Sequence, residues 1–170
     1  MPDPGLTMIH FRAISDADLD FLRELYASTR EEEMSVVPWA SSEKQAFLAM
    51  QFEAQHAFYA EQFPQARFDL VLEDETPIGR LYLDKREDEH RLIDIALLPS
   101  HRGRGIGGRL MREVLEQAAA DGKAVRIHVE RNNPARRLYD RLGFRKIEDQ
   151  GVYDLLEWRP EVAAAAGENR

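Results

Sequence analysis

The stretch His101–Gly108, HRGRGIGG, gathers glycine and arginine at one point of the chain. Four of its eight residues are glycines, two are arginines, and a third arginine, Arg109, follows directly. Glycine lets a backbone turn tightly and come close to a ligand, and the first N–H groups of a helix attract an anion. Because a run with helical periodicity follows, the stretch predicts a loop that binds phosphate or pyrophosphate through backbone N–H groups.

The segment Gly103–Gly108 also fits G-x-G-x-x-G, the pattern of dinucleotide-binding loops, whereas no segment fits a Walker loop. Two observations argue against a nicotinamide-dependent oxidoreductase. The pattern follows two predicted helices and about four strands instead of the first strand, and only 62 residues remain after it. Glu130 stands near the position of a ribose-binding acid, and we interpret this match as accidental.

Periodicity predicts the elements that must position this loop. Strands are expected at 6–14, 68–72, 78–83, 91–98, 124–129, 144–148 and 152–158. Helices are expected at 16–29, 41–63, 105–121 and 133–142, with a loop or short turn at 30–38. The hairpins and the single strand–loop–helix–strand unit together indicate an α/β (α+β) fold.

Composition limits the classes of function. The 170 residues are 44% apolar and 32% charged, which suits one soluble globular domain. The absence of cysteine removes disulfides, thiolate metal sites and a cysteine nucleophile, and fits a cytoplasmic protein. The five histidines show no metal-ligand spacing, so no metal is expected. No apolar run reaches ~18 residues, and the net charge of −8 argues against nucleic acid, so neither a membrane nor a nucleic acid is an expected partner.

The negative charge is concentrated in the N-terminal third. Residues 1–66 carry eleven acidic and four basic residues, a net charge of −7, whereas residues 67–170 carry −1. This distribution fits either a solubilising surface or a field that attracts a cationic partner. Within it, the segment EEEMSVVPW combines Glu31 and Glu32 with Trp39, a combination suited to a cationic amine and equally to an ordinary solvated loop.

Two motifs resemble signatures of the GNAT superfamily of N-acetyltransferases. LLPSHRGRGIGGRLM resembles the acetyl-CoA signature [QR]-x-x-G-x-[GA], here Arg102–Gly107, and NNPARRLYDRLGF, residues 132–144, resembles the second signature. Their order and the interval of one helix and one strand also match. The resemblance covers residues 68–158, and the N-terminal third matches only by the order of its elements.

The resemblance implies a single-domain, GNAT-like mixed sheet. About seven mostly antiparallel strands would be flanked by helices, and the strands at 91–98 and 124–129 would splay apart. One N-acetyltransferase domain is expected at 1–160, with 1–66 on the acceptor side and 67–160 as the acetyl-CoA-binding core. A loose tail is expected at 161–170.

The resemblance also implies residues that bind acetyl-CoA as cosubstrate. Open backbone groups at Leu97 and Leu98 would bind the pantetheine arm, with Asn132 near it and Asn133 as the competing candidate or the helix cap. The backbone N–H groups around the pyrophosphate would come from Arg102, Gly103, Arg104, Gly105, Ile106, Gly107 and Gly108.

The catalytic residues are only partly assigned by the resemblance. Tyr139 matches the family tyrosine that protonates the departing thiolate, although it also suits a core position. Some members carry a carboxylate base where this chain has Arg91. Asp94 on the same strand is either a base with a raised pKa or the structural partner of an arginine. Weaker candidates are Glu130 and the acids at 31–33, and a water relay is an equal alternative.

The implied function is transfer of an acetyl group from acetyl-CoA to a primary amine by direct attack in a ternary complex. The expected acceptor is a cationic small molecule or a peptide amine. Alternatives are a non-catalytic module that senses acetyl-CoA and the nicotinamide-dependent oxidoreductase. Many members of the family form dimers, so a homodimer is an option, although no segment marks an interface.

Overall fold

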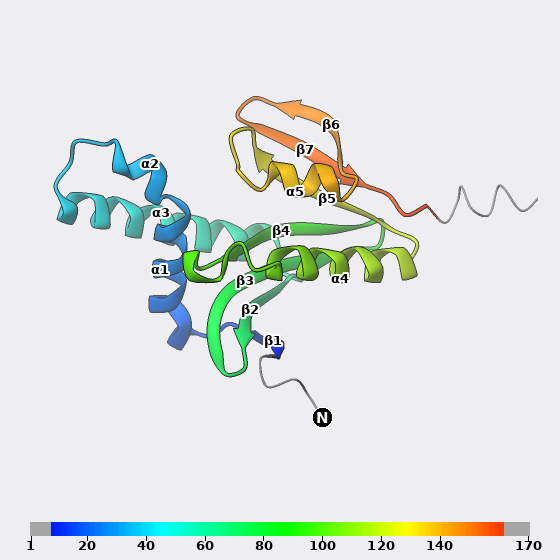
Figure 1. Cartoon of the computed structure of the whole chain (residues 1–170), viewed down its shortest axis with the longest axis horizontal. Helices are drawn as coiled ribbons and strands as arrows, with labels where there is room; N and C mark the ends of the chain where they lie inside the picture. The colour runs from blue at the N-terminus through cyan, green and yellow to red at the C-terminus, as the bar shows by residue number, and fades with distance from the viewer. Residues whose placement is uncertain (1–7, 162–170) are drawn as a thin grey trace, which may run out of the picture. The chain divides into compact units, whose positions relative to one another are not determined.

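The computed structural model describes residues 8–161. The strands are β1 (Ile9–Ala13), β2 (Arg67–Glu73), β3 (Thr76–Lys85), β4 (Glu89–Leu97), β5 (Ala124–Glu130), β6 (Arg145–Gln150) and β7 (Tyr153–Trp158) (Figure 1). The helices are α1 (Leu19–Thr29), α2 (Glu31–Ser35), α3 (Ser41–Gln62), α4 (Ile106–Ala120) and α5 (Arg136–Arg141), with 3-10 turns η1 (Asp16–Asp18) and η2 (Pro99–His101). The beginning of the first expected strand and nearly all of the expected tail lie outside the described residues.

The strands form one mixed sheet in the order β1-β2-β3-β4-β5-β7-β6. The pairs β1–β2, β5–β7 and β6–β7 are antiparallel, whereas β4 and β5 run parallel. The expected mixed, mostly antiparallel sheet is therefore confirmed. Contacts between residues divide the chain into two compact units that share β3 and β4, and each unit has its own packing.

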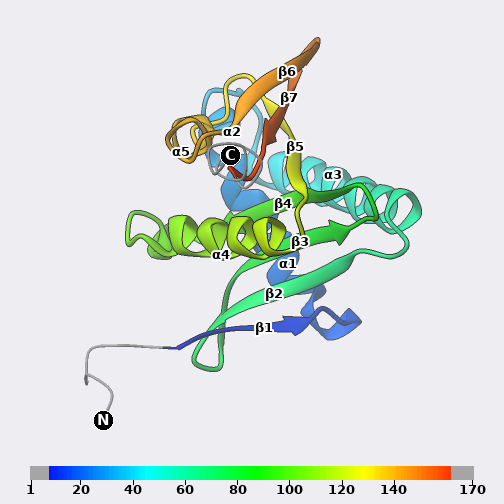
Figure 2. The ribbon, with the colours of Figure 1, turned by 90° about the vertical axis from the view of Figure 1, so that its right-hand side faces the viewer.

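The first unit holds residues 8–81 and 95–102 of the described chain. Its core packs two helices on a strand: Leu22 and Tyr26 from α1 and Phe52 from α3 are buried with Leu70 from β2. Each such side chain contributes roughly 1.5–3 kcal/mol when it is fully buried. In the same unit, β1 lies beside β2 (Figure 2) and pairs with it from Ile9 to Ala13.

The second unit holds residues 82–94 and 103–161. Its central helix, α4, has an apolar side that is buried and contacts β5. The buried side chains of α4 are Ile106, Leu110, Met111, Val114, Leu115 and Ala118. Because this packing fixes α4, it also fixes the glycine-rich turn at its N-terminus.

The parallel pairing of β4 with β5 is short. Within the described residues it joins Glu89–Arg91 to Ala124–Arg126 and then ends, although β4 continues to Leu97 and β5 to Glu130. The backbone groups of β5 beyond this point pair with β7 on the other side. A splayed pair of strands requires the hydrogen bonding between β4 and β5 to end early in this way.

A charge network stabilises the paired part of these strands. The carboxylate of Glu89, which is 5% exposed, accepts hydrogen bonds from Arg91 at 2.8 Å and from Arg126 at 2.9 Å. Arg126 also contacts Glu157 of β7 at 2.7 Å. Burial acts to raise the pKa of Glu89, but the bonds from the two arginines outweigh it and hold this pKa below its ordinary value.

The structure corrects the expected loop at 30–38. Residues Glu31–Ser35 form the short helix α2, with three glutamates in its first turn and Met34 buried. Acidic side chains are favourable at a helix N-terminus, and a single buried methionine is too weak a periodic signal to reveal five helical residues. The hairpin turn is also shorter than expected, because β2 ends at Glu73 and β3 begins at Thr76.

None of the helices in the described part of the chain is both long and apolar enough to span a membrane.

We expect Glu89→Gln to lower the free energy of unfolding at pH 7 by roughly 2–3 kcal/mol, because two partly buried arginines would lose their shared negative charge. The pKa of Glu89 is lowered in the folded state, so its contribution exists above the ordinary value of about 4.3 and is lost as the pH falls below it. Urea unfolding of wild type and variant at pH 7 and pH 3 measures this.

The matched control is Glu116→Gln, which changes an exposed glutamate of α4. It should leave stability unchanged at both pH values. A difference between wild type and Glu89→Gln that is as large at pH 3 as at pH 7 would contradict the role of the Glu89 charge.

Candidate functional site

The glycine-rich turn before α4 has a backbone that other residues rarely adopt. Gly103 has φ 73° and Gly105 has φ 80°, and Gly105 is the N-cap of α4. A Cβ added at either glycine would meet nothing within 4 Å. Glycine is therefore required here by the backbone conformation and not by crowding, and open space remains in front of the turn.

The same turn presents unpaired backbone N–H groups. The first backbone bond of α4 runs from the N–H of Arg109 to the carbonyl of Gly105, at 3.1 Å. Within residues 8–161, the N–H groups of Gly103, Gly105 and the segment 106–108 make no backbone hydrogen bond outside the helix ladder. The 15 residues of α4 add the positive end of their dipole. These features suit an anion such as a diphosphate.

The side chain of Arg102 is expected to contact phosphate, but in the structure it donates hydrogen bonds to other residues of the protein. Its Nε donates to the carbonyl of Leu97 at 2.9 Å, and its Nη2 donates to Oγ of Ser28 at 3.3 Å. Its backbone N–H donates to Pro99 at 3.2 Å. The expectation of an open N–H at Arg102 is thus corrected, because that group closes the turn η2.

The end of β4 offers fewer open backbone groups than expected. The N–H of Leu98 donates to Ile78 at 2.8 Å, and its carbonyl accepts from His101 at 2.9 Å, so the expected open backbone at Leu98 is corrected. Neighbouring N–H groups of a strand point to opposite edges, so the N–H of Leu97 points away from β3. Gly79 of β3 lets this strand lie close to the end of β4. A Cβ at position 79 would lie 2.2 Å from the carbonyl oxygen of Ala96.

Asp94 and Tyr139 influence one another electrostatically within the second unit. Tyr139 is 3% exposed, and its ring contacts Phe144 edge-on with centroids 5.5 Å apart. Burial raises the pKa of Tyr139 above its ordinary value, and the negative charge of Asp94 raises it further. The charge of Asp94 on β4 therefore acts on Tyr139 of α5, and the phenol stays protonated at neutral pH.

The two asparagines before α5 have different surroundings. Asn133 supports the turn: its Oδ1 accepts from the N–H of Ala135 at 2.8 Å, and its carbonyl accepts from Arg136 at 3.0 Å. The side chain of Asn132 is exposed and has no hydrogen bond within the described residues. Asn132 is therefore the one of the pair that is free to contact a ligand.

The acceptor-side candidates lie in the first unit. Glu33 of α2 pairs with Arg30 at 2.9 Å, whereas Glu31 and Glu32 are exposed and have no ion pair among residues 8–161. Trp39 is 43% exposed, and its ring contacts Phe47 edge-on with centroids 5.3 Å apart. Two free carboxylates and an aromatic ring remain accessible in one short segment.

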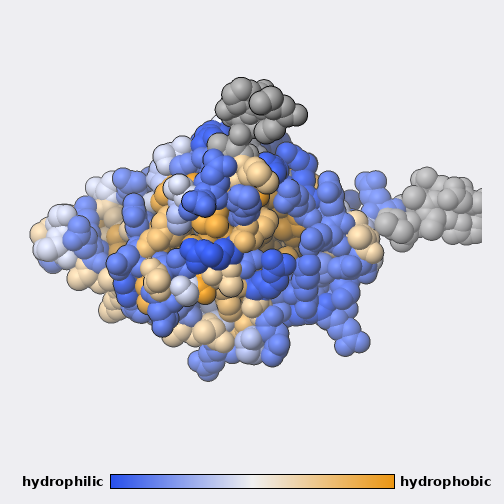
Figure 3. Space-filling model, turned by 90° about the horizontal axis from the view of Figure 1, so that it is seen from below, coloured by the Kyte–Doolittle hydropathy of each residue, from blue (hydrophilic) through white to orange (hydrophobic). Residues whose placement is uncertain are grey.

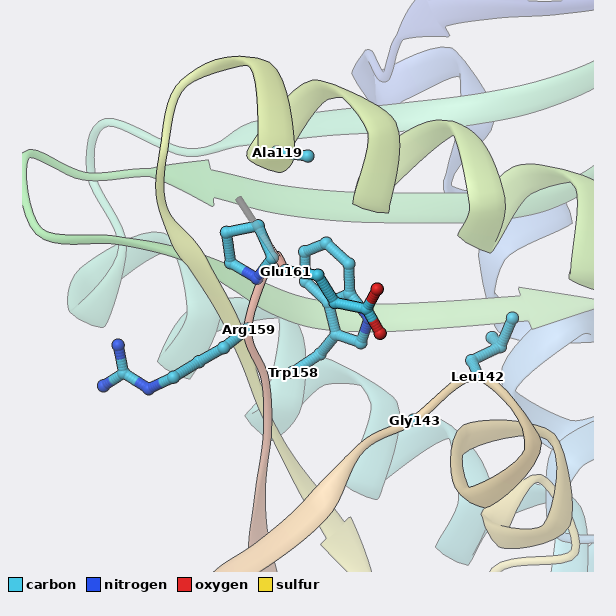
Figure 4. Close-up of a pocket in the computed structure, with 7 residues that line it drawn as sticks. Ala119, Leu142, Gly143, Trp158, Arg159 and Glu161 are labelled. Carbon is cyan, nitrogen blue, oxygen red and sulfur yellow. The ribbon is translucent and has the colours of Figure 1, made fainter. Parts of the chain in front are cut away.

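A cavity of about 490 Å³ lies elsewhere in the second unit, and sequence reasoning gave no signal for it. Figure 4 shows the side chains around it, which come from the ends of α4, α5 and β7. Its lining residues are Ala119, Leu142, Gly143, Trp158, Arg159, Pro160 and Glu161.

One face of the molecule shows hydrophobic side chains among hydrophilic ones (Figure 3). Within the described residues, no group of three or more histidine, cysteine, aspartate or glutamate side chains is placed to hold a metal ion. The glycine-rich turn is thus the best-defined site for an anionic ligand.

Comparison with known proteins gives a consistent result. The sequence model of the acetyltransferase (GNAT) family matches residues 20–144. The chain is 30% identical over 137 residues to mycothiol acetyltransferase of Brachybacterium faecium, covering 72% of this chain and 41% of that protein. It is 30% identical over 84 residues to the [ribosomal protein bS18]-alanine N-acetyltransferase of Haemophilus influenzae, covering 49% and 58%. The chain thus spans about half the length of these curated relatives.

A solved structure shows the same fold. The PaiA N-acetyltransferase of Thermoplasma acidophilum, in complex with coenzyme A, aligns with a TM-score of 0.68 at 19% identity. The alignment covers 89% of this chain and 99% of that chain.

We expect Gly105→Ala and Gly108→Ala to have opposite effects on stability. Gly105 has a positive φ, so alanine there should cost about 1–2 kcal/mol. Gly108 lies in the first turn of α4, where a Cβ would come within 3.2 Å of the flexible end of Arg112 and 4.0 Å of Leu138, which is an ordinary contact. Alanine at 108 should therefore be neutral or stabilising by up to about 1 kcal/mol. Urea unfolding measures both, and equal losses would contradict the described turn.

Proposed function

The chain belongs to the acetyltransferase (GNAT) family, and on this premise we propose that it transfers an acetyl group from acetyl-CoA to an amine. The observation that carries the proposal is the turn at Gly103 and Gly105, whose N–H groups make no backbone hydrogen bond among the described residues and whose Cβ positions are open. A diphosphate placed there would accept several hydrogen bonds and meet the positive end of the helix dipole.

Further residues would hold the rest of acetyl-CoA. Arg104 is exposed in the turn and would add positive charge for the phosphates. Asn132 would donate or accept a hydrogen bond along the pantetheine arm. The N–H of Leu97 would bind the thioester carbonyl oxygen and stabilise the negative charge that develops on it.

The proposed chemistry is direct transfer. The amine nitrogen bonds to the acetyl carbon, the carbon–sulfur bond breaks, the ammonium loses a proton, and the thiolate gains one. The chain has no cysteine, which removes the commonest covalent acyl-enzyme route. The reaction therefore includes two proton transfers: the amine nitrogen loses a proton and the sulfur gains one.

Tyr139 and Asp94 are the groups proposed for these transfers. The raised pKa of Tyr139 keeps its hydroxyl protonated, which is the state that a proton donor to the thiolate requires. Asp94 would accept the proton from the amine, directly or through water. The charge of Asp94 also opposes loss of the phenol proton.

The proposed acceptor is a positively charged small molecule or a peptide amine. The N-terminal 66 residues carry a net charge of −7, and Glu31 and Glu32 have no ion pair to neutralise them among the described residues. One named relative is a mycothiol acetyltransferase and the other a ribosomal-protein alanine N-acetyltransferase, so their names do not decide between a small molecule and a protein. The local negative charge favours a cationic amine in either class.

The direct test incubates the protein with acetyl-CoA and a panel of amines, including a polyamine, free amino acids and a peptide with N-terminal alanine. Because the chain lacks cysteine, a thiol reagent reports only released CoA. We expect release that depends on one class of cationic amine and an amine product heavier by one acetyl group. Tight CoA binding without any product would instead indicate a non-catalytic sensor.

We expect Tyr139→Phe to lower kcat by about 10²-fold and to change KM for acetyl-CoA by less than about threefold. Because the pKa of Tyr139 is raised above its ordinary value of about 10, the hydroxyl should remain protonated up to that pH. Tyr139→Phe should therefore keep the shape of the pH–rate profile and lower it throughout.

Asp94→Asn is the matched comparison. If Asp94 accepts the amine proton, this variant should lower kcat and change KM for acetyl-CoA by less than about threefold, as expected for Tyr139→Phe. An unchanged kcat in Tyr139→Phe would remove Tyr139 from the mechanism, and an unchanged kcat in Asp94→Asn would leave Asp94 with a structural role.

A further inference from the structure

We propose that the side chain of Arg102 is a positioning residue that fixes the end of β4, and that it is not a ligand of the cosubstrate phosphates. The inference rests on the proposed function and deepens it. Its basis is the direction of the guanidinium group, which donates to the carbonyl of Leu97 and to the hydroxyl of Ser28.

The contact with Ser28 connects Arg102, through hydrogen bonds, to the buried residue Leu25 of α1. The hydroxyl of Ser28 accepts from Arg102 at 3.3 Å and donates its own proton to the carbonyl of Leu25 at 2.6 Å. Leu25 is fully buried in α1. The three residues thus form a chain of hydrogen bonds from the end of β4 to the last turns of α1, all within the first unit.

The segment from Leu97 to Arg102 makes three hydrogen bonds within itself and one to β3. Leu98 donates to β3, His101 donates back to Leu98, and the backbone of Arg102 donates to Pro99. The Arg102 side chain then bonds the carbonyl of Leu97, five residues earlier. This bond orients the Leu97 residue at the end of β4.

The geometry of arginine explains why charge alone would not suffice. Nε and Nη2 donate along two fixed directions of one planar group, one to Leu97 and one to Ser28. A lysine would keep the positive charge but could not reproduce both directions. Arg102→Lys therefore separates a positioning role from an electrostatic one.

The activity test compares acetyl-CoA with S-acetylpantetheine, which lacks phosphates. We expect Arg102→Met and Arg102→Lys to lower kcat about tenfold with both donors, because a misplaced Leu97 affects the thioester in each. The ratio of the two donors' KM values should stay as in wild type. Arg104→Met, by contrast, should raise KM for acetyl-CoA only. Arg145→Met, an exposed arginine of β6, controls for the loss of one positive charge.

Two further measurements keep the inference testable if Arg102 variants fold poorly or no acceptor is found. Ser28→Ala leaves Arg102 in place and should lower kcat about two- to threefold with both donors. Amide hydrogen exchange of the free protein needs no substrate: exchange at Leu98, His101 and Arg102 should accelerate about tenfold in Arg102→Met and Arg102→Lys.

The inference is overturned if Arg102→Lys retains wild-type kcat and exchange rates, or if the loss is confined to the phosphate-bearing donor. Either result would make Arg102 an electrostatic ligand of acetyl-CoA. Absence of any acetyl transfer by the wild type would remove the proposed function but leave the exchange experiment decisive for Arg102.

Discussion

The arrangement depends on a left-handed backbone at Gly103 and Gly105, which leads into α4, whose first N–H groups make no backbone hydrogen bond among the described residues. The elements on each side of the turn limit how it can move. The apolar side of α4 is buried in the second unit, so the helix cannot rotate to hide its N-terminus. On the other side, the bonds from Leu97 to Arg102 fix where the chain enters the turn.

The two units differ in how their charged side chains are paired. In the second unit the strong charges are compensated, as in the bonds of Arg91 and Arg126 to Glu89. Tyr139 there is buried and kept protonated, a state suited to proton donation. In the first unit the exposed carboxylates of α2 are only partly paired. The proposed cationic acceptor would thus meet uncompensated negative charge in the first unit.

The sequence was sufficient for the parts of the fold that periodicity and glycine encode. Alternating and helical patterns predicted α3 and α4 to within about two residues at each end, because many apolar side chains repeat in each. The glycine turn was predictable because positive φ restricts residue choice. The helix α2 was missed because only Met34 of its five residues is buried.

The local bonds of the site could not be read from the sequence. Arg102 looked like a phosphate ligand because it stands in a glycine-rich run, yet one of its partners, Ser28, is 74 residues away. The open backbone expected at Leu98 was wrong because its partner, Ile78, belongs to another strand. Such pairings arise only when the chain folds, so composition and spacing carry no signal for them.

The central claim is that backbone N–H groups of the turn bind the diphosphate of acetyl-CoA. Amide chemical shifts measured by NMR during titration with CoA, and separately with pantetheine, test it most directly. The account predicts that the amides of Gly103–Gly108 shift strongly with CoA and little with pantetheine. Large CoA-induced shifts confined to the cavity around Trp158, with the turn unaffected, would contradict it.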